Sequence, residues 1–77
     1  MVEAYVLVQT EVGQAGPVAS AIKALPGVVT AEDVTGPYDV IIRVQAETVD
    51  ALGPLVMSKV QSVPGITRTV TCTVVHA

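Results

Sequence analysis

The sequence predicts an α+β domain of the ferredoxin-like β-α-β-β-α-β type, with a four-stranded antiparallel sheet and two helices on one face. Its 77 residues suffice for one domain, residues 1–77. With 51% hydrophobic and 14% charged residues, the chain is predicted to fold rather than stay disordered. Two short patterns also recur: Val-Gln-Thr-Glu (8–11) as Val-Gln-Ala-Glu (44–47), and Leu-Pro-Gly-Val (25–28) as Val-Pro-Gly-Ile (63–66). These repeats indicate two similar β-α-β halves.

The first half begins with a strand over residues 2–10, where β-branched residues are frequent and side chains alternate. A helix follows over residues 17–25, because apolar residues recur there with helical spacing and Pro17 suits a first helical turn. Pro26-Gly27 ends this helix. A second strand, over residues 28–34, completes the half.

The second half begins after a turn at Gly36-Pro37-Tyr38-Asp39 and has a strand over residues 39–46. Apolar spacing from Val49 to Val60 predicts a second helix, with Asp50 as candidate cap. Gly53-Pro54 leaves open whether the helix begins at Val49 or only there. The last strand is expected over residues 66–75.

Strand alternation predicts two different faces of the sheet. One face, toward the helices, carries Ala4, Val6, Val8, Val40, Ile42 and Val44. The other carries Tyr5, Leu7, Ile41 and Arg43, and is more apolar than an ordinary exposed face. We expect it to pack against a second copy, giving a two-fold homodimer of the dimeric α+β barrel kind. The alternative is a monomer with scattered surface apolar residues.

Composition excludes several classes of function. Four Lys and Arg against seven Asp and Glu cannot form a basic stripe, so direct nucleic-acid binding is not expected. The apolar stretches are too short for a membrane helix, and without a secretory leader we expect a cytoplasmic protein. One cysteine and one histidine exclude a disulfide within the chain and a zinc site built from several such residues. No cofactor is predicted.

No catalytic constellation is present, so an enzyme is not expected. His76 is interpreted as a solvated tail residue and Cys72 as a small buried hydrophobe. Glu32 and Asp33 point to opposite faces of a strand predicted at the sheet edge. Gly13-x-x-Gly16 lacks the full dinucleotide-binding pattern and is interpreted as a flexible loop.

Two features are candidates for ligand binding. Asp39, in the turn, could accept a hydrogen bond from a ligand's ammonium group or cap the N–H groups of its own turn. Thr67, Thr69, Thr71 and Thr73 share one face of the last strand. They fit either simple β-propensity or a row of hydroxyls lining a small polar site. Arg68 could assist with a carboxylate, or be an exposed cation.

These residues resemble a known family over essentially the whole chain. The chain is similar to the effector-binding (RAM) domain of the Lrp/AsnC transcription regulators. The resemblance rests on Gly36-Pro37-Tyr38-Asp39 followed by Val40-Ile41-Ile42, on Leu52-Gly53, and on Val63-Pro64-Gly65-Ile66 leading to Thr69 and Thr71.

The resemblance implies the same fold, sheet-to-sheet dimers, rings of dimers, and a free amino acid bound as effector between neighbouring dimers. It assigns ligand binding to Gly36, Tyr38, Asp39, Thr69 and Thr71. The chain starts directly on its first strand, so it resembles a stand-alone form without the helix-turn-helix. It would act as a sensor in transcriptional regulation of amino-acid metabolism, or join full-length regulators.

Three rival interpretations remain open. An ACT-type sensor would place its ligand near Gly13 and Gly16. A small monooxygenase of the same topology would use His, Trp, Asn or Phe in a pocket, and this chain has no Trp or Phe and a terminal His76. An assembly module without a ligand would need only the apolar sheet face.

Overall fold

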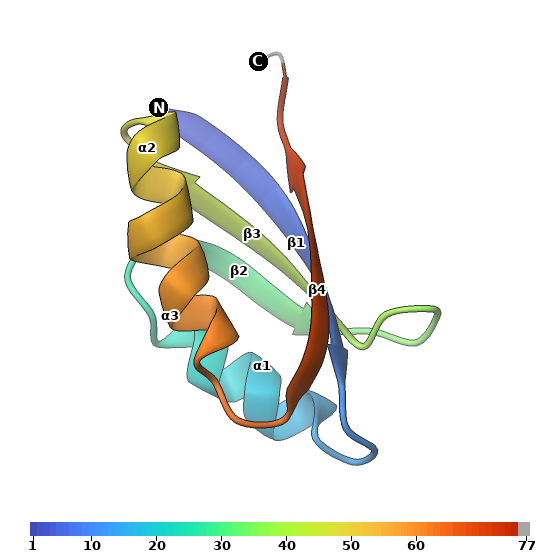
Figure 1. Cartoon of the computed structure of the whole chain (residues 1–77). Coiled ribbons are helices and arrows are strands. Elements are labelled where there is room, and N and C mark those ends of the chain that lie inside the picture. The colour runs from blue at the N-terminus through green and yellow to red at the C-terminus, as the bar shows by residue number, and fades with distance from the viewer. Residues whose placement is uncertain (76–77) are drawn as a thin grey trace.

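The computed structural model describes residues 1–75, apart from the side chains of Pro54 and Leu55. The helices cover one face of the sheet, and a connection between two strands projects from the other side (Figure 1). We call this connection, residues 34–38, the arm. In order, the elements are β1 (Val2–Thr10), α1 (Ala15–Lys23), β2 (Val28–Asp33), β3 (Val40–Ala46), α2 (Val49–Ala51), η1 (Leu52–Met57), α3 (Ser58–Gln61) and β4 (Ile66–Thr73).

The sheet has the strand order β2-β3-β1-β4, and each neighbouring pair is antiparallel. This confirms the predicted ferredoxin-like arrangement. Each of the three pairings joins a strand of the first half to a strand of the second. The sheet is open within the chain, and β2 and β4 are its two edges. The barrel therefore remains a prediction about a pair of chains.

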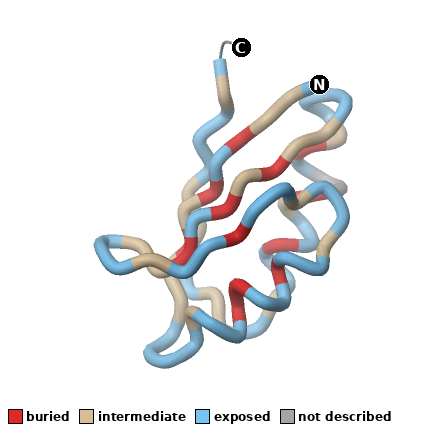
Figure 2. Tube along the Cα trace, turned by 180° about the vertical axis from the view of Figure 1, so that it is seen from behind, coloured by how far each residue is buried: buried red, intermediate tan, exposed pale blue. Residues whose placement is uncertain are grey.

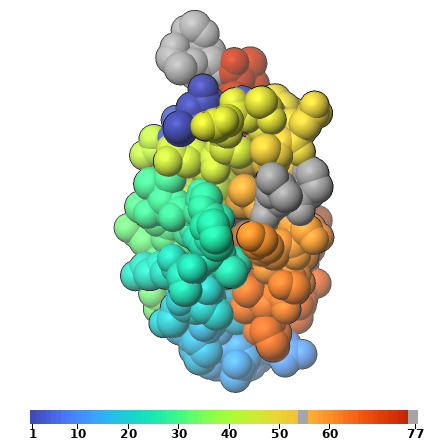
Figure 3. Space-filling view, turned by 90° about the vertical axis from the view of Figure 1, so that its left-hand side faces the viewer, coloured from blue at the N-terminus to red at the C-terminus, as the bar shows by residue number. Residues whose placement is uncertain are grey.

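The core lies between the sheet and the helices, where buried positions alternate along β1 and β3 (Figure 2). The register pairs Ala4 with Val44, Val6 with Ile42, and Val8 with Val40. All six predicted core residues have no exposed surface, which confirms the predicted helix-facing side. The helices contribute buried side chains at one face: Val18, Ala19, Ile22, Leu52, Val56 and Val60. Seen from the helix side, the segment from the end of α1 to β2 lies beside α3, with α2 at the upper end of the view (Figure 3).

The first helix occupies Ala15–Lys23 rather than the predicted 17–25. Pro17 is the third residue of α1. The first four N–H groups of a helix have no partner within the helix, so a proline is tolerated there. At the other end, the N–H of Leu25 donates to the carbonyl of Ile22 at 2.9 Å, a tight turn that follows the last helical residue.

The second helical region runs without a break from α2 through η1 to α3, so Gly53-Pro54 is not its beginning. Thr48, and not the predicted Asp50, is the N-cap: its hydroxyl accepts the N–H of Ala51 at 3.1 Å. A proline has no N–H to donate to the carbonyl four residues earlier. The chain instead forms the wider π-type turn of η1, where the N–H of Ser58 donates to the carbonyl of Gly53.

The prediction that Cys72 is buried is wrong, because its side chain is exposed in this chain. Cys72 pairs with Tyr5 across β1 and β4, so it lies on the face of the sheet away from the helices. The prediction rested on the apolar neighbours of Cys72 in the sequence. In the structure, side chains alternate between the two faces of the edge strand β4, and Cys72 falls on the exposed face. His76 lies outside the described residues.

Candidate functional site

The sheet face away from the helices, which we call the outer face, brings together the four predicted interface residues. The register places Tyr5 opposite Arg43 and Leu7 opposite Ile41. Tyr5 is 44% exposed and Ile41 36% exposed. The Glu3 carboxylate accepts a hydrogen bond from Nε of Arg43 at 2.9 Å, and this bond raises the pKa of the Arg43 guanidinium. The outer face therefore has an apolar centre. Beside this centre, the opposite charges of Glu3 and Arg43 neutralise each other.

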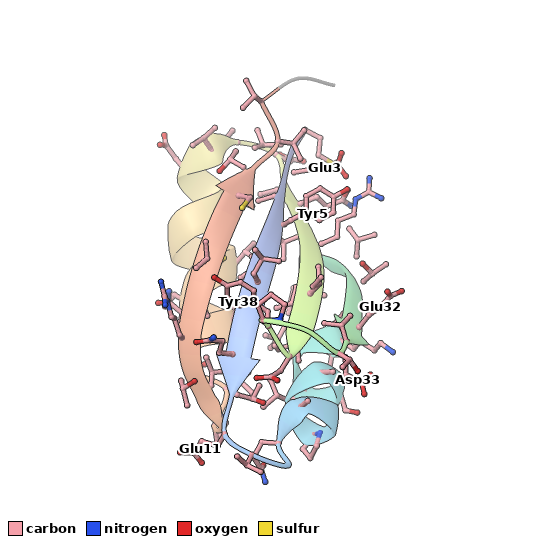
Figure 4. The ribbon with its side chains drawn as sticks, turned by 90° about the vertical axis from the view of Figure 1, so that its right-hand side faces the viewer. Glu3, Tyr5, Glu11, Glu32, Asp33 and Tyr38 are labelled. Atoms are coloured by element: carbon pink, nitrogen blue, oxygen red, sulfur yellow. The ribbon has the colours of Figure 1, made fainter. Side chains whose placement is uncertain are left out.

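The arm is fastened to the far end of β1. The side-chain amide of Gln9 donates to the carbonyl of Pro37 at 3.1 Å. The N–H of Asp39 donates to the carbonyl of Val8 at 2.9 Å, and the N–H of Val34 donates to the carbonyl of Asp39 at 2.8 Å. The arm crosses in front of the sheet with Tyr38 over β1, while Tyr5 lies nearer the end that carries Glu3 (Figure 4).

The Asp39 carboxylate joins the start of β3 to the end of β1. Its Oδ2 accepts the N–H of Thr10 at 2.8 Å, and the Thr10 hydroxyl lies 3.4 Å from the same oxygen. Asp39 therefore caps the end of β1 rather than the N–H groups of its own turn. Both hydrogen bonds formed within residues 1–75 go to Oδ2, which leaves the Oδ1 lone pairs available.

A shallow hollow of about 370 Å³ lies between the arm and the outer face. Its floor comes from Leu7 and Ile41, and its wall is the arm itself, from Val34 to Tyr38. The lining is mainly apolar. Sequence reasoning did not predict this hollow, because it arises where the arm folds back over the sheet.

The predicted threonines lie on the other side of the sheet. Thr69 pairs with Val8 and Thr71 with Val6, so both side chains are on the helix-facing side of β4. The Thr69 hydroxyl accepts a hydrogen bond from the Gln61 amide at 3.4 Å, and the Thr71 hydroxyl lies 3.9 Å from the Met57 sulfur. Within one chain, Gly36, Tyr38 and Asp39 thus lie together in or beside the arm, apart from the two threonines. Arg68 is exposed on β4, opposite Gln9.

A comparison with known protein families identifies the family of this domain. The model of the Lrp/AsnC ligand binding domain matches residues 3–77. The chain belongs to the Lrp/AsnC ligand-binding domain family. This confirms the predicted resemblance over nearly the whole chain and favours it over the ACT-type and monooxygenase interpretations.

Two further proteins are similar to this domain, one in sequence and one in both sequence and structure. An uncharacterised HTH-type transcriptional regulator of Pyrococcus furiosus, PF0250, is 33% identical over 54 residues, which are 70% of this chain and 36% of that protein. The chain thus spans about a third of this curated relative. The crystal structure of TTHA0845 from Thermus thermophilus has a TM-score of 0.91 at 32% identity, covering 100% of this chain and 96% of that one.

A more distant structure is informative about fold alone. The transcriptional regulator NMB0573 of Neisseria meningitidis, solved as a complex with L-Met, has a TM-score of 0.81 at 18% identity. The match covers 97% of this chain and 50% of that one. The Lrp/AsnC domain fold is thus also found as half of a longer regulator.

This Lrp/AsnC domain has a second hollow, of about 340 Å³, at the opposite end of the sheet from the arm. It forms where the start of β1 and the end of β4 meet α2, which no sequence motif signals. Its lining residues are Met1, Val2, Glu3, Val49, Thr73, Val74 and Val75. Within residues 1–75, no three His, Cys, Asp or Glu side chains gather as a metal site, and no helix is long and apolar enough to cross a membrane.

Proposed function

We propose that this chain is an amino-acid-sensing and assembly domain that acts in transcriptional regulation through its partners, in the cytoplasm. The match to the Lrp/AsnC ligand binding domain over residues 3–77 carries the proposal. The L-Met complex of NMB0573 supports a free amino acid as the class of effector. With four Lys and Arg among 77 residues, we propose that any contact with DNA is made by a partner regulator. We propose no catalytic role.

The chemistry of the arm suits the ammonium end of such an effector. An amino acid needs an acceptor near its ammonium group and donors near its carboxylate. Asp39 can keep Thr10 on Oδ2 and offer Oδ1 to the ammonium, while Gly36 and Tyr38 shape the surroundings. Thr69 and Thr71 carry hydroxyl donors, with Arg68 nearby in sequence. Since these residues lie on the other side of the sheet, we propose that a complete site combines the arm of one dimer with β4 of a neighbouring dimer.

The outer face supports the assembly part of the proposal. Tyr5, Leu7 and Ile41 form an apolar centre that water would otherwise contact. We propose that two copies bury these centres against each other around a two-fold axis, giving the dimeric barrel, and that dimers join into a ring. Full-length regulators of the same family are candidate partners in mixed assemblies.

Native mass spectrometry with a panel of the common amino acids tests the sensing function directly. We expect an assembly of dimers that gains one amino-acid mass per chain. Asp39→Asn keeps an acceptor for the Thr10 N–H and removes the negative charge, so the dissociation constant should rise about 10- to 100-fold with the fold intact. Asp33→Asn is the matched control, because Asp33 is an exposed acid on β2, and its affinity should be unchanged.

Two outcomes would contradict parts of this proposal. Unchanged affinity in Asp39→Asn would remove the Asp39 charge from the site. An assembly of dimers that ignores every amino acid would leave an assembly module without an effector.

A further inference from the structure

The hollow beneath the arm lies on the outer face, which is also the predicted dimer interface. The sheet of a second copy must therefore fit against both the arm and the hollow. Facing sheets pack with their backbones about 10 Å apart. The arm stands out from one end of the outer face, and the end around Glu3 and Tyr5 is free of it (Figure 4). Two arms stacked at the same end would hold the sheets apart there and leave the Tyr5 ends uncovered.

The arms therefore fit best when each lies over the arm-free end of the other copy. A two-fold axis that runs across the strands gives this arrangement. It places Tyr5 of one copy opposite the hollow of the other. The contact then occurs twice, once in each direction, as a two-fold interface requires.

Tyr5 has the properties that this hollow would accept. It is an aromatic residue on the outer face and is 44% exposed. The hollow is mainly apolar, and its volume of about 370 Å³ is enough for a whole tyrosine side chain. Beside Tyr5, the charges of Glu3 and Arg43 already neutralise each other, so bringing this end against an apolar surface leaves no single unpaired charge there.

We infer that the hollow formed by the arm, Leu7 and Ile41 is a socket for Tyr5 of a second copy of this chain. The inference rests on the sheet-to-sheet dimer proposed above and adds the orientation of the two copies. In this dimer, Tyr5 and the arm determine how the two copies are oriented. They favour the orientation with the arms at opposite ends over the one with both arms at the same end.

Cysteine cross-linking tests the contact. In a Cys72→Ser background, Tyr5→Cys and Thr35→Cys are prepared separately, mixed in equal amounts and oxidised, and the disulfide-linked species are identified by intact mass. A disulfide needs Cα atoms roughly 4.4–6.8 Å apart, so it reports close approach. We expect linked pairs that contain one chain of each kind. Val12→Cys, in the exposed turn after β1, is the control and should link to neither variant.

Affinity gives a second, independent measurement. Tyr5→Ala should raise the dimer dissociation constant about 10- to 100-fold, because the buried ring is lost from both sockets, and Tyr5→Phe should stay within a few-fold of the parent.

Links between two Thr35→Cys chains or two Tyr5→Cys chains would overturn the inference and leave the dimer standing, as would a dimer with no links. A monomeric parent protein in native mass spectrometry would instead remove the sheet-to-sheet dimer itself. Amino-acid binding is measured separately, so these failures can be distinguished.

Discussion

At the scale of single residues, two glycines form the turns that lead from the helices into the next strands. Each of these glycines follows a proline. Gly27 and Gly65 have φ values of +87° and +97°, a region that favours glycine. Their carbonyls accept the N–H groups of Gln45 and Glu11, each at 2.8 Å. The repeated Pro-Gly pattern thus marks the same kind of turn in both halves of the chain.

We expect Gly27→Ala to lower the free energy of unfolding by about 1–3 kcal/mol. A Cβ atom there would lie 3.0 Å from a methyl of Val56 and 3.2 Å from the carbonyl oxygen of Gln45, in addition to the unfavourable φ. Urea denaturation at one fixed protein concentration is the measurement, since the stability of the proposed dimer would depend on protein concentration.

Gly16→Ala is the matched control for this change. Gly16 lies in α1, and a Cβ there meets nothing within 4 Å. Alanine should change stability by no more than about 0.5 kcal/mol, because its better helix propensity is opposed by the crowding of its Cβ against the ring of Pro17, the next residue. Equal losses in both variants would show that the turn geometry at Gly27 is not the cause.

The hydrogen-bond partner of Asp39 could not be predicted from residue types. Its place in a turn was evident from the sequence, and so was its capacity to accept hydrogen bonds. Its partner is Thr10, which lies 29 positions earlier and comes close only because β1 and β3 are neighbours in the sheet. No local pattern contains that information.

At the scale of elements, the start of α2 depends on Thr48. We expect Thr48→Ala to lower the free energy of unfolding by about 1 kcal/mol, because the N–H of Ala51 loses its acceptor. Asp50→Asn, which removes only a charge from the first turn, should lose a few tenths of a kcal/mol. Thermal and urea unfolding of the two variants would measure the difference. A larger loss in Asp50→Asn would show that Asp50 is the cap.

The strands were predicted closely, and the second helix less well. β1 has the predicted bounds of residues 2–10, because β-branched residues are frequent there and favour a strand. In the second helix, the apolar spacing and the Gly53-Pro54 pair gave conflicting signals. The burial of Leu52 and Val56 against the sheet outweighs the breaking effect of the proline, and η1 provides the local adjustment.

At the scale of the whole molecule, the outer face is the surface through which we propose that two chains associate. We expect Leu7→Glu or Ile41→Glu to convert the dimer to a monomer that keeps its secondary structure, because a carboxylate would be buried at the apolar centre of the interface. Native mass spectrometry and far-ultraviolet circular dichroism measure the two properties. Val12→Glu, a fully exposed change outside the outer face, should leave the dimer intact. If either outer-face variant keeps the dimer mass, this face is not the interface.

The candidate site was predicted in part. Alternation along the strands predicted which residues share the outer face. The separation of the arm from Thr69 and Thr71 was not predicted, because it depends on the register of β4 against β1. The predicted site residues therefore lie in two separate groups within one chain, and we propose that an assembly of chains brings them together.

The strand order also has a consequence for folding. β2 pairs with β3, β3 with β1, and β1 with β4, so each ladder of hydrogen bonds joins one half of the chain to the other. A single β-α-β half would contain two strands that are not neighbours, with no ladder between them. Neither half can then form a sheet before the other arrives. The domain should accordingly fold in one cooperative step, governed by the long-range pairing of β1 with β3 and β4 rather than by the two repeated units separately.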